Sequence, residues 1–574
     1  CYVNLDEQYF VSGAEGDTAS STIRTCHGGV VGGAGSNAVM VSDCIVLGIT
    51  PYSTSVYTGN DVQHTGGSSH FKNVYTDQAT GQIQINYNTG WAYYIQDFSS
   101  VVFQLTPAQM QGSAAVGNMN LAWFSVWKPG AEGEYPTFVK PGEESGISFW
   151  TGTADAGFAG GTGTQEDPFI IETADQLYRA LSTVTYTTST SGDLAVETAE
   201  SVAGGTQTDR IFKQGSTTVY APVYTPYYYK VADGIEAFYL NNVYGNETLA
   251  GAKAMVAAGT AKDWKPGKSF VGHLDGNGVT IYGMYSSTGQ GLVYKLDGSS
   301  TVKNINFNAC YASGTGNIAL LTTNLGAYTN DSTRIKVSNI SVRNSYIGTT
   351  RAITLTARTD TSGCYDHAPG PAGIVSTNST PENITISNCL YDGRSCERAI
   401  GAGSEATIDM MGGIYNGASS ANNFTLSGCV SLGAPAVNEV YVSGKEVFYN
   451  RYDKNGGFEV YFYNSYSDMP LNGITTAYPN KYDKLSDITR IATKDAYEMF
   501  DMPKLSWAEW TLVTVDGRTI PMPTINKAEE LVGSYVEIIG KGQNNYAGFG
   551  PYEYGGNPYT YLLKGAGTEE NPYI

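Results

Sequence analysis

Ile384-Thr385-Ile386-Ser387-Asn388-Cys389-Leu390 is a short alternating strand that ends in a turn, and its last four positions recur 40 residues later as Ser427-Gly428-Cys429-Val430. Three further copies close similar strands: Asn308-Ala309-Cys310-Tyr311, Arg343-Asn344-Ser345-Tyr346 and Tyr463-Asn464-Ser465-Tyr466. From the first copy to the last, the successive steps are 35, 44, 40 and 36 residues. A strand-and-turn unit repeated every few tens of residues predicts parallel strands stacked as a solenoid, in which equivalent residues lie above one another.

Gly-rich apolar stretches precede two of these strands, at Ala372-Gly373-Ile374-Val375 and Gly412-Gly413-Ile414-Tyr415. We interpret each stretch as the preceding strand of the same coil. No two-residue hairpin signature separates the strands, which favours parallel over antiparallel pairing. Every second side chain of a strand points inward, so Ile, Val, Leu and Cys at the repeated positions are predicted to form core stacks about 4.8 Å apart.

A longer repeat indicates how the chain is divided. Residues 161–170 return at 565–574, a shift of 404 residues, with nine matched or conservatively exchanged positions in ten. The spacing of 43 residues from Cys1 to Cys44 is similar to the 40 from Cys389 to Cys429. The predicted organisation is the C-terminal third of one module (1–140), a linker (141–160), a complete module (161–525), a connector between modules (526–564) and the start of a further module (565–574). We therefore expect the chain to begin inside a coil and to end where a new module opens.

Cys1 has a second interpretation, because a mature bacterial lipoprotein also begins with cysteine. Its place on the internal cysteine spacing favours a segment of a longer tandem protein instead.

Short helices are predicted at the module ends. Thr173 and Gln176 form a capping box before Leu177 and Leu181, and this helix is expected to cover the N-terminal edge of the solenoid. Thr106-Pro107-Ala108-Gln109 is a capping box with proline at the first helical position. A third helix-start signal, Asn526-Lys527-Ala528-Glu529, opens the predicted connector.

Composition limits the possible partners. Only 15% of the 574 residues are charged and the formal net charge is −20, so nucleic acid and anionic membrane surfaces are poor partners. No apolar run reaches about 18 residues, which predicts no membrane span in this segment. The 69 glycines and 43 tyrosines, against 11 methionines, suit many short strands and tight turns and exclude an all-α protein.

Several motifs together resemble those of secreted right-handed parallel β-helix proteins of bacteria and archaea that carry GLUG-type repeats. Residues 163–170 resemble the opening of the family's module, and Tyr228-Tyr229-Lys230-Val231 its first strand. Residues 273–281, with Asp275-Gly276-Asn277-Gly278 at their centre, resemble the next coil, and 105–110 resemble the closing segment. The resemblance covers most of the chain and implies an all-β, right-handed parallel β-helix fold with short capping helices and a cell-surface setting. It implies no reaction.

No catalytic, cofactor-binding or metal-binding residue is predicted. A β-helix polysaccharide lyase or hydrolase needs clustered carboxylates, and no repeated strand carries a close acidic cluster. The Asp275-Gly276-Asn277-Gly278 motif could be a fragment of a calcium loop, but we interpret it as a turn. Two segments rich in charge, Cys and His could bind metal, but surface loops are favoured because no second ligand pair has suitable spacing; these are Arg24, Cys26 and His27, and Arg351, Arg358, Asp360, Cys364, Asp366 and His367.

The eight cysteines fall into two groups. Cys1, Cys44, Cys310, Cys389 and Cys429 lie on the repeated position; they are interpreted as stacked buried thiols, slightly favoured, or as disulfides that clamp coils. Cys26, Cys364 and Cys396 are expected in loops, where they are freer to form disulfides.

Tyrosines and sequons offer surface chemistry. Tyr227-Tyr228-Tyr229 and the set from Tyr552 to Tyr561 could form a sugar-stacking platform, although strand propensity and packing explain them as well. Possible glycosylation acceptors are Asn246, Asn330, Asn339, Asn378, Asn383 and Asn423, a number close to chance for this composition.

The sequence therefore predicts a non-catalytic, extracellular structural or adhesive protein, a segment of a long repetitive rod, fibre or sheath at a cell surface. Its expected partners are other copies or modules of the same protein and, beyond these, glycans or cell surfaces. The alternative is a carbohydrate-binding or polysaccharide-degrading β-helix protein.

Overall fold

The computed structural model contains two compact units, Cys1–Gly146 and Ile147–Ile574. The residues described within them are 2–4, 41–47, 71–77, 82–86, 93–97, 102–124, 126–139, 146–182, 184–185, 189–191, 194–196, 202–203, 205–214, 217–326, 334–357, 364–367, 370–377, 382–417, 422–437, 440–442, 445–447, 460–469, 488–524, 535–539 and 560–564. Strands dominate these ranges, and none of the helices within them has the length and apolar character needed to cross a membrane.

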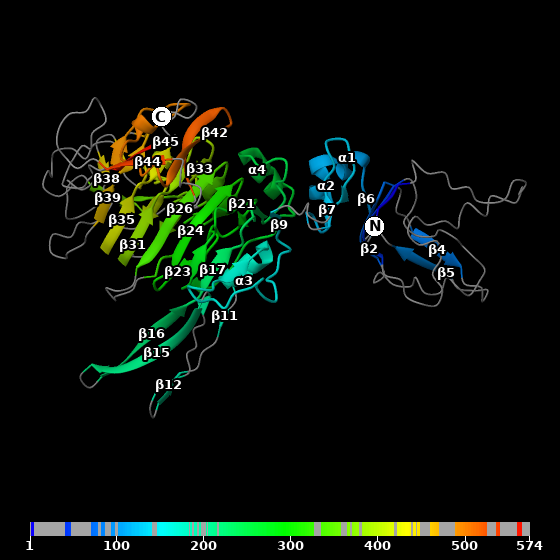
Figure 1. The fold of residues 1–574 in the computed structure, drawn as a ribbon, viewed down its shortest axis with the longest axis horizontal. Helices are drawn as coiled ribbons and strands as arrows, with labels where there is room; N and C mark the ends of the chain where they lie inside the picture. Colours follow the sequence, from blue (N-terminus) through cyan, green and yellow to red (C-terminus); the bar gives the residue numbers. More distant parts are fainter. Residues whose placement is uncertain are drawn as a thin grey trace, which may run out of the picture. The chain divides into compact units, whose positions relative to one another are not determined.

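The centre of unit 2 is a sheet of 15 strands whose described pairings are all parallel (Figure 1). The sheet consists of two ladders, because β24 (Thr301–Asn308) and β26 (Ile335–Arg343) run through both. Ladder A contains the first halves of these two strands and β10 (Phe169–Ile171), β17 (Tyr228–Val231), β20 (His273–Asp275), β31 (Glu382–Ser387), β35 (Asn422–Ser427) and β39 (Val460–Tyr463). Ladder B contains their second halves and β9 (Ile147–Phe149), β18 (Ala237–Tyr239), β21 (Thr280–Tyr282), β32 (Leu390–Asp392), β36 (Val430–Leu432), β40 (Ser465–Ser467) and β41 (Ile488–Arg490).

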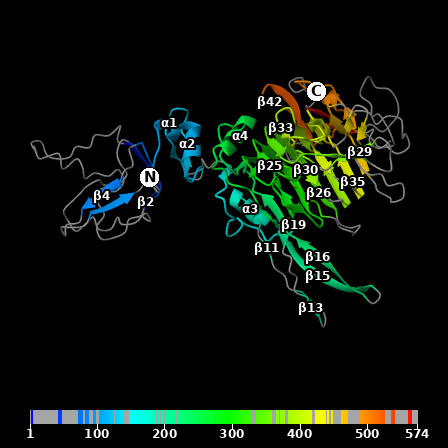
Figure 2. The ribbon, with the colours of Figure 1, turned by 180° about the vertical axis from the view of Figure 1, so that it is seen from behind.

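Shorter parallel ladders accompany this sheet, and Figure 2 labels one of their strands, β30, in the view from behind. Ladder C contains β22 (Tyr285–Ser286), β25 (Tyr311–Gly314), β27 (Tyr346–Thr349) and β33 (Glu397–Ala399). The others are β30 (Val375–Thr377) with β34 (Tyr415–Gly417), and β14 (Val202–Ala203), β19 (Ser269–Phe270) and β23 (Lys295–Leu296). The pairing of Val375 with Tyr415 places the two Gly-rich stretches in the same register, as predicted from the sequence. The side chains that point inward from these ladders form one apolar core from Trp150 to Ile488.

A left-handed residue links ladder A to ladder B at five successive levels, from β24 to β39. Asn304, Asn339, Asn388, Gly428 and Asn464 have φ between 49° and 60°, a region that Gly and Asn tolerate best. The amides also connect the levels, since Asn339 Nδ2 donates to Asn304 Oδ1 at 2.9 Å. This turn chemistry explains why the repeated motif is rich in Asn and Gly.

The predicted alignment is correct for the two motifs that begin at Asn308 and Arg343, and for the three that begin at Ser387, Ser427 and Tyr463. It is wrong between these two groups. Ser338 pairs with Ser387, so Asn339, and not Asn344, is in register with Asn388. The predicted step of 44 residues therefore joins two different turns. The later steps are confirmed, because Ser427 pairs with Ser387 on one side and with Tyr463 on the other.

Asn344 belongs to a second left-handed column, which links ladder B to ladder C and also contains Ala309. Cys310 and Ser345 follow these residues, whereas Cys389 and Cys429 follow the column between ladders A and B. Both columns need a residue that tolerates positive φ. A small buried residue follows Asn344 in one column and Asn388 in the other, so the local sequence is alike at these two turns, whereas Ile340 follows Asn339.

The repeated strands pair in parallel as predicted, but antiparallel pairs that the sequence analysis did not anticipate occur elsewhere in unit 2. Antiparallel pairs are β12 (Ser189–Ser191) with β13 (Leu194–Val196), β15 (Gly205–Gln214) with β16 (Thr217–Pro226), β28 (Leu355–Ala357) with β29 (Cys364–His367), β37 (Val440–Val442) with β38 (Lys445–Val447), β42 (Trp510–Val515) with β43 (Arg518–Pro523), β44 (Tyr535–Ile539) with β45 (Thr560–Lys564), and β11 (Val184–Thr185) with β14. The signals were present: Gly215-Ser216 separates β15 from β16, and Asp516-Gly517 separates β42 from β43.

Two α-helices lie against the ladders of unit 2. Helix α3 (Ala174–Ser182) begins as predicted, with the Thr173 hydroxyl accepting from Gln176 N at 3.1 Å, and it packs against β10, the first strand of ladder A. Helix α4 (Leu249–Ala257) packs against β25 and β27 of ladder C, and Lys253 Nζ lies 2.9 Å from Glu397 Oε2. Two 3₁₀ turns, η4 (Ile408–Met410) and η6 (Met499–Asp501), complete the described helical segments.

Unit 1 repeats the same local chemistry on a smaller scale. Its parallel ladder contains β1 (Tyr2–Asn4), β2 (Val41–Leu47), β3 (Phe71–Thr76) and β6 (Val102–Gln104). Asp43 and Asn73 are left-handed, and Asn73 Nδ2 donates to Asp43 Oδ1 at 2.9 Å. The remaining elements are α1 (Pro107–Met110), α2 (Gly112–Asn118) and the antiparallel pairs β4 (Gln82–Asn86) with β5 (Tyr93–Asp97) and β7 (Trp127–Lys128) with β8 (Thr137–Phe138). Helix α1 has the predicted capping box and Pro107 at its first position.

The unit boundary differs from the predicted one. Within the predicted linker 141–160, β9 pairs with β18 of ladder B and Trp150 lies in the core, so residues from 147 onward are integral to unit 2. The predicted connector contains the pair β44–β45. Its helix-start signal at Asn526 and the segment 565–574 lie outside the described residues.

Candidate functional site

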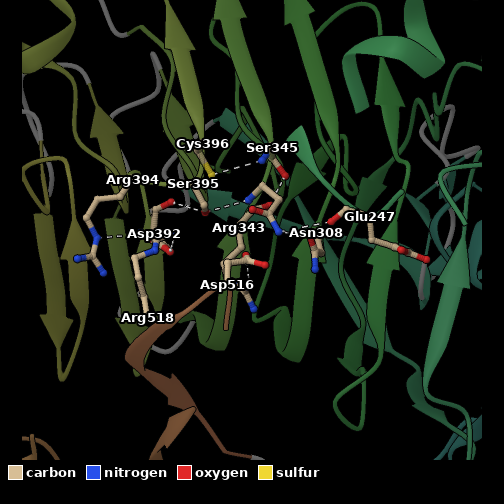
Figure 3. Close-up of polar contacts among 11 residues, drawn as sticks. Glu247, Asn308, Arg343, Ser345, Asp392, Arg394, Ser395, Cys396, Asp516 and Arg518 are labelled. Carbon is tan, nitrogen blue, oxygen red and sulfur yellow. Dashed lines mark hydrogen bonds and ion pairs between the residues drawn. The ribbon is translucent and has the colours of Figure 1, made fainter. Parts of the chain in front are cut away.

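The strongest concentration of buried charge in the described part of the chain lies where the β42–β43 hairpin meets ladder B (Figure 3). We call Asp392, Arg394, Asp468 and Arg518 the Asp392 cluster. Asp392 ends β32 and is 0% exposed, and Asp468 follows β40 and is 5% exposed.

Two guanidinium groups reach the Asp392 carboxylate. Arg518 approaches both oxygens, with Nη1 3.5 Å from Oδ1 and Nη2 3.3 Å from Oδ2. Arg394 places Nε 3.4 Å from Oδ1, and its guanidinium lies 5.5 Å from the centre of the Tyr497 ring. A planar guanidinium fork is the group best matched to a carboxylate, so Arg518 gives this contact both charge and direction.

Asp468 has less compensation than Asp392. Two arginines form ion pairs with Asp392, whereas Asp468 Oδ1 accepts from a backbone group, Gly433 N, at 2.6 Å. The Oδ2 atoms of both residues have no hydrogen-bond partner among the described residues. Burial is the main cause that raises the pKa of Asp468, with a further contribution from the negative charge of Asp392, while Gly433 N–H and Arg394 act in the opposite direction. A raised carboxyl pKa means that the fold favours the protonated acid.

We predict that Asp468→Asn removes a pH dependence of stability in unit 2. The folded pKa lies above the ordinary value of 3.8, so the protonated acid stabilises the fold below 3.8 and this contribution disappears as pH rises through the folded pKa. The asparagine keeps an oxygen that can accept from Gly433 N–H. Urea unfolding at a series of pH values should show the wild type losing stability relative to the variant between pH 3.8 and neutrality. Parallel curves for the two proteins would contradict the prediction.

The charges of the cluster are positioned by a tight hairpin turn. Asp516 and Gly517 both have positive φ, as a two-residue turn requires. Arg518 then points to Asp392, and Asp516 Oδ2 lies 3.5 Å from Arg343 Nη2 in β26. No part of the sequence analysis identified the four residues of the Asp392 cluster; the Asp-Gly pair could have located the turn, but not the strand it meets.

An apolar layer beneath the Asp392 cluster also packs the β42–β43 hairpin against ladder B. It is formed by outward side chains of ladder B, such as Leu390, Val430 and Tyr466, and by Trp510 and Ile520 of the hairpin. Tyr466 also accepts from Lys504 N at 2.7 Å. The Asp392 cluster therefore joins distant segments of chain, and neither of its carboxylates is open to a polymer substrate.

The cysteines divide differently from the prediction. Cys310, Cys389 and Cys429 are buried and their thiols are free in the structure, whereas Cys44 is disulfide-bonded, with its partner outside the described residues. Cys396 lies in the loop between β32 and β33, as expected, and is a part-buried free cysteine. Its sulfur accepts from Ser345 N at 3.5 Å, and burial raises its pKa to about 12, which makes the thiol unreactive. Its position beside ladder C, one level beyond Ser345, was hidden by the wrong step in the repeat alignment. Cys1, Cys26 and the Cys364 side chain lie outside the described residues.

The turn interpretation of the Asp275 motif is confirmed. Asn277 N donates to Asp275 Oδ1 at 2.9 Å, and Asn277 and Gly278 both have positive φ. Lys303 Nζ lies 3.0 Å from Asp275 Oδ2, so this carboxylate already forms an ion pair. Within the described ranges no group of three or more His, Cys, Asp or Glu side chains could hold a metal ion.

Of the two segments considered for metal binding, the structure describes the side chain of Arg351 alone, whose Nη2 is 3.5 Å from Asn317 Oδ1. The side chains of Arg24, Cys26, His27, Arg358, Asp360, Cys364, Asp366 and His367 lie outside the described residues.

The tyrosine run near Pro226 serves packing for the most part. Tyr229 is buried in the core and Tyr227 packs against Phe169, whereas Tyr228 points outward and stacks on His273 with ring centres 4.3 Å apart. The set from Tyr552 to Tyr561 has no described side chains.

The sequons are not equivalent. Asn246 is exposed before α4, while Asn339 is half-buried and bonded to Asn304. Asn383 is 7% exposed, so a glycan cannot be attached to it without opening the strand. The Asn330, Asn378 and Asn423 side chains lie outside the described residues.

The outward side of ladder A is the most regular partly exposed surface among the described residues. We call it the ladder-A face; its two columns are Tyr228, His273, Thr301, Lys336, Thr385 and Thr425, and Lys230, Asp275, Lys303, Ser338, Ser387 and Ser427. Hydroxyl, aromatic and basic groups dominate it. Burial, with help from the positive charge of Lys336, lowers the pKa of His273, so this imidazole is neutral at pH 7.

No protein-family model matches the chain, and no curated protein or solved structure matches it either. Function therefore has to follow from the geometry of the chain itself, which presents parallel ladders, a buried ionic contact and a flat polar face.

Proposed function

We propose that this protein is a non-catalytic, extracellular structural or adhesive protein, built from right-handed parallel β-helix modules that repeat in tandem to form a surface rod, fibre or sheath. The observation that carries the proposal is the in-register parallel stacking of the 15-stranded sheet, in which side chains lie in columns from level to level. A solenoid of this kind is held by backbone hydrogen bonds along its whole length, which makes it stiff.

A recurrent contact supports the tandem arrangement. Tyr75 of unit 1 accepts from Asn120 N at 2.7 Å, and Tyr466 of unit 2 accepts from Lys504 N at 2.7 Å. Both tyrosines lie in a parallel ladder, two residues after a left-handed asparagine, and both bind the segment that follows the ladder. Equivalent contacts in both units are expected if unit 1 is the closing part of a module like unit 2.

The disulfide at Cys44 supports the proposed location, since lasting disulfides form in oxidising compartments. The ladder-A face supplies a flat surface rich in hydroxyl groups for contacts with other copies, glycans or cells. The buried Asp392 cluster supports a structural over a hydrolytic role, because its carboxylates stabilise the join between ladder B and the hairpin.

A carbohydrate-binding β-helix protein is the second candidate, and the Tyr228–His273 stack on the ladder-A face favours it. An aromatic ring on an exposed strand can pack against a sugar ring. This candidate and the first share the same surface, and they differ in whether a glycan or another copy occupies it.

Electron microscopy of the native material, in negative stain, tests the proposal. Long rods, tubes or fibres with a regular axial repeat are expected. Isolated compact particles would overturn the assembly part of the proposal, and binding or cleavage of polysaccharides by such particles would favour the second candidate.

A further inference from the structure

Cys389 and Cys429 lie directly opposite each other on neighbouring strands. Each follows a left-handed residue, and the residues on either side of them are paired, Ser387 with Ser427 and Leu390 with Val430. Neighbouring strands are about 4.8 Å apart. Disulfides join residues whose Cα atoms are about 4.4–6.8 Å apart, so the register places this pair within bonding range.

Among the described residues, the two thiols have no strong hydrogen-bond partner that would compete with disulfide formation. Both side chains are fully buried, and their hydrogen bonds go to backbone carbonyls: Cys389 Sγ donates to Ser387 O at 3.2 Å and Cys429 Sγ to Ser427 O at 3.5 Å. Burial, followed by the neighbouring Cys429 thiol, raises the pKa of Cys389 well above its ordinary value. A thiol held protonated in this way exchanges slowly once the core has closed.

Unit 1 supplies an independent observation. Cys44 in β2 follows the left-handed Asp43, just as Cys389 follows the left-handed Asn388, and Cys44 is disulfide-bonded. The position after the left-handed residue therefore accommodates a disulfide in a parallel ladder of this chain.

The Cys389 and Cys429 thiols are free in the structure. We propose that they form a disulfide that clamps two successive levels of unit 2 when the protein folds in an oxidising compartment. The S–S bond forms by exchange with a disulfide oxidant: the two thiols lose their protons and two electrons, and the oxidant is reduced to two thiols. Because the folded core protects both sulfurs, the bond forms before the core closes. This modification site stands apart from the proposed adhesive function, since it depends on register and redox environment alone.

Cys310 and Cys396 provide a built-in contrast. Cys310 N donates to Ser345 Oγ at 3.0 Å, and Ser345 N donates to Cys396 Sγ at 3.5 Å, so Ser345 separates the two cysteines by one full level. Two strand spacings amount to about 10 Å, which exceeds the reach of a disulfide.

The test is to refold the full chain in a mixture of oxidised and reduced glutathione, alkylate it with N-ethylmaleimide under denaturing conditions and map the peptides by mass spectrometry. A Cys389–Cys429 linked peptide is expected, with Cys310 and Cys396 alkylated. If Cys44 is bridged in the same sample while Cys389 and Cys429 are both alkylated, the proposal is overturned, because oxidation has then occurred without using this pair.

Two variants separate the disulfide from general effects on folding. Cys429→Ser should abolish the linked peptide and the fall of several degrees in thermal midpoint that reduction causes in unit 2, and serine is already accommodated in this column at Ser465. Cys310→Ser is the matched control. It should retain both the linked peptide and the fall in thermal midpoint on reduction. Equal sensitivity of the wild type and Cys429→Ser to reduction would also count against the clamp.

Discussion

Asp392→Asn is expected to lower the free energy of unfolding of unit 2 by about 3–5 kcal/mol, the usual range for removing one member of a buried ion pair. The substitution keeps the size of the side chain but leaves the guanidinium groups of Arg394 and Arg518 without their buried counter-charge. Unfolding in guanidinium chloride, followed by tryptophan fluorescence, provides the measurement, because Trp507 and Trp510 lie in the apolar layer beneath the cluster and contribute to the signal.

Asp516→Asn is the control on the same hairpin. Asp516 also faces an arginine, at 3.5 Å from Arg343, but it is 62% exposed, so its loss should change stability by no more than about 1 kcal/mol. If the two variants had equal effects, the Asp392 contact would not be the one that holds the hairpin against ladder B.

Gly413→Ala is expected to destabilise unit 2 by about 1–3 kcal/mol, since an added methyl group overpacks the core. A Cβ at this position would lie 2.3 Å from Tyr391 Cδ1 and 2.6 Å from Ser431 Oγ. Gly373, one level away, meets the same ring from its other edge, at 2.2 Å from Tyr391 Cδ2. The glycines of the two apolar stretches therefore make room for Tyr391.

Chemical unfolding of a double-mutant cycle tests this explanation. Tyr391→Leu should reduce the destabilisation caused by Gly413→Ala, because the smaller side chain can move away. Gly316→Ala is the control, since nothing lies within 4 Å of the added Cβ, and it should leave stability unchanged or slightly increased. An undiminished effect of Gly413→Ala in the Tyr391→Leu background would locate the clash elsewhere.

Much of the local structure of unit 2 could be predicted because it depends on neighbouring residues. Alternation in Ile384-Thr385-Ile386 marks a strand, and the left-handed Asn388 that follows marks its turn. The capping box at Thr106 and the N-cap hydroxyl of Thr173 start helices where expected, although the Gln176 side chain accepts from Glu172 N and not from Thr173 N. Even the step of 40 residues between Cys389 and Cys429 is confirmed by the pairing.

The candidate site could not be predicted in the same way. Asp392 and Arg518 are 126 residues apart, and no periodic pattern marks either of them. The sequence also could not show which asparagine is in register with Asn388. Asn339 and Asn344 are chemically alike, and only the pairing of Ser338 with Ser387 distinguishes them.

The sequence by itself determined that this chain forms short, largely parallel strands joined by Asn- and Gly-rich turns, since alternation and tolerance of positive φ are properties of a few adjacent residues. Tertiary structure alone decided which turn lies above which, that Cys389 faces Cys429 while Ser345 separates Cys310 from Cys396, and that a hairpin brings Arg518 to Asp392. The physical reason is that burial and ion pairing depend on which segments pack together, and that free energy is summed over the whole core rather than over any one stretch of chain.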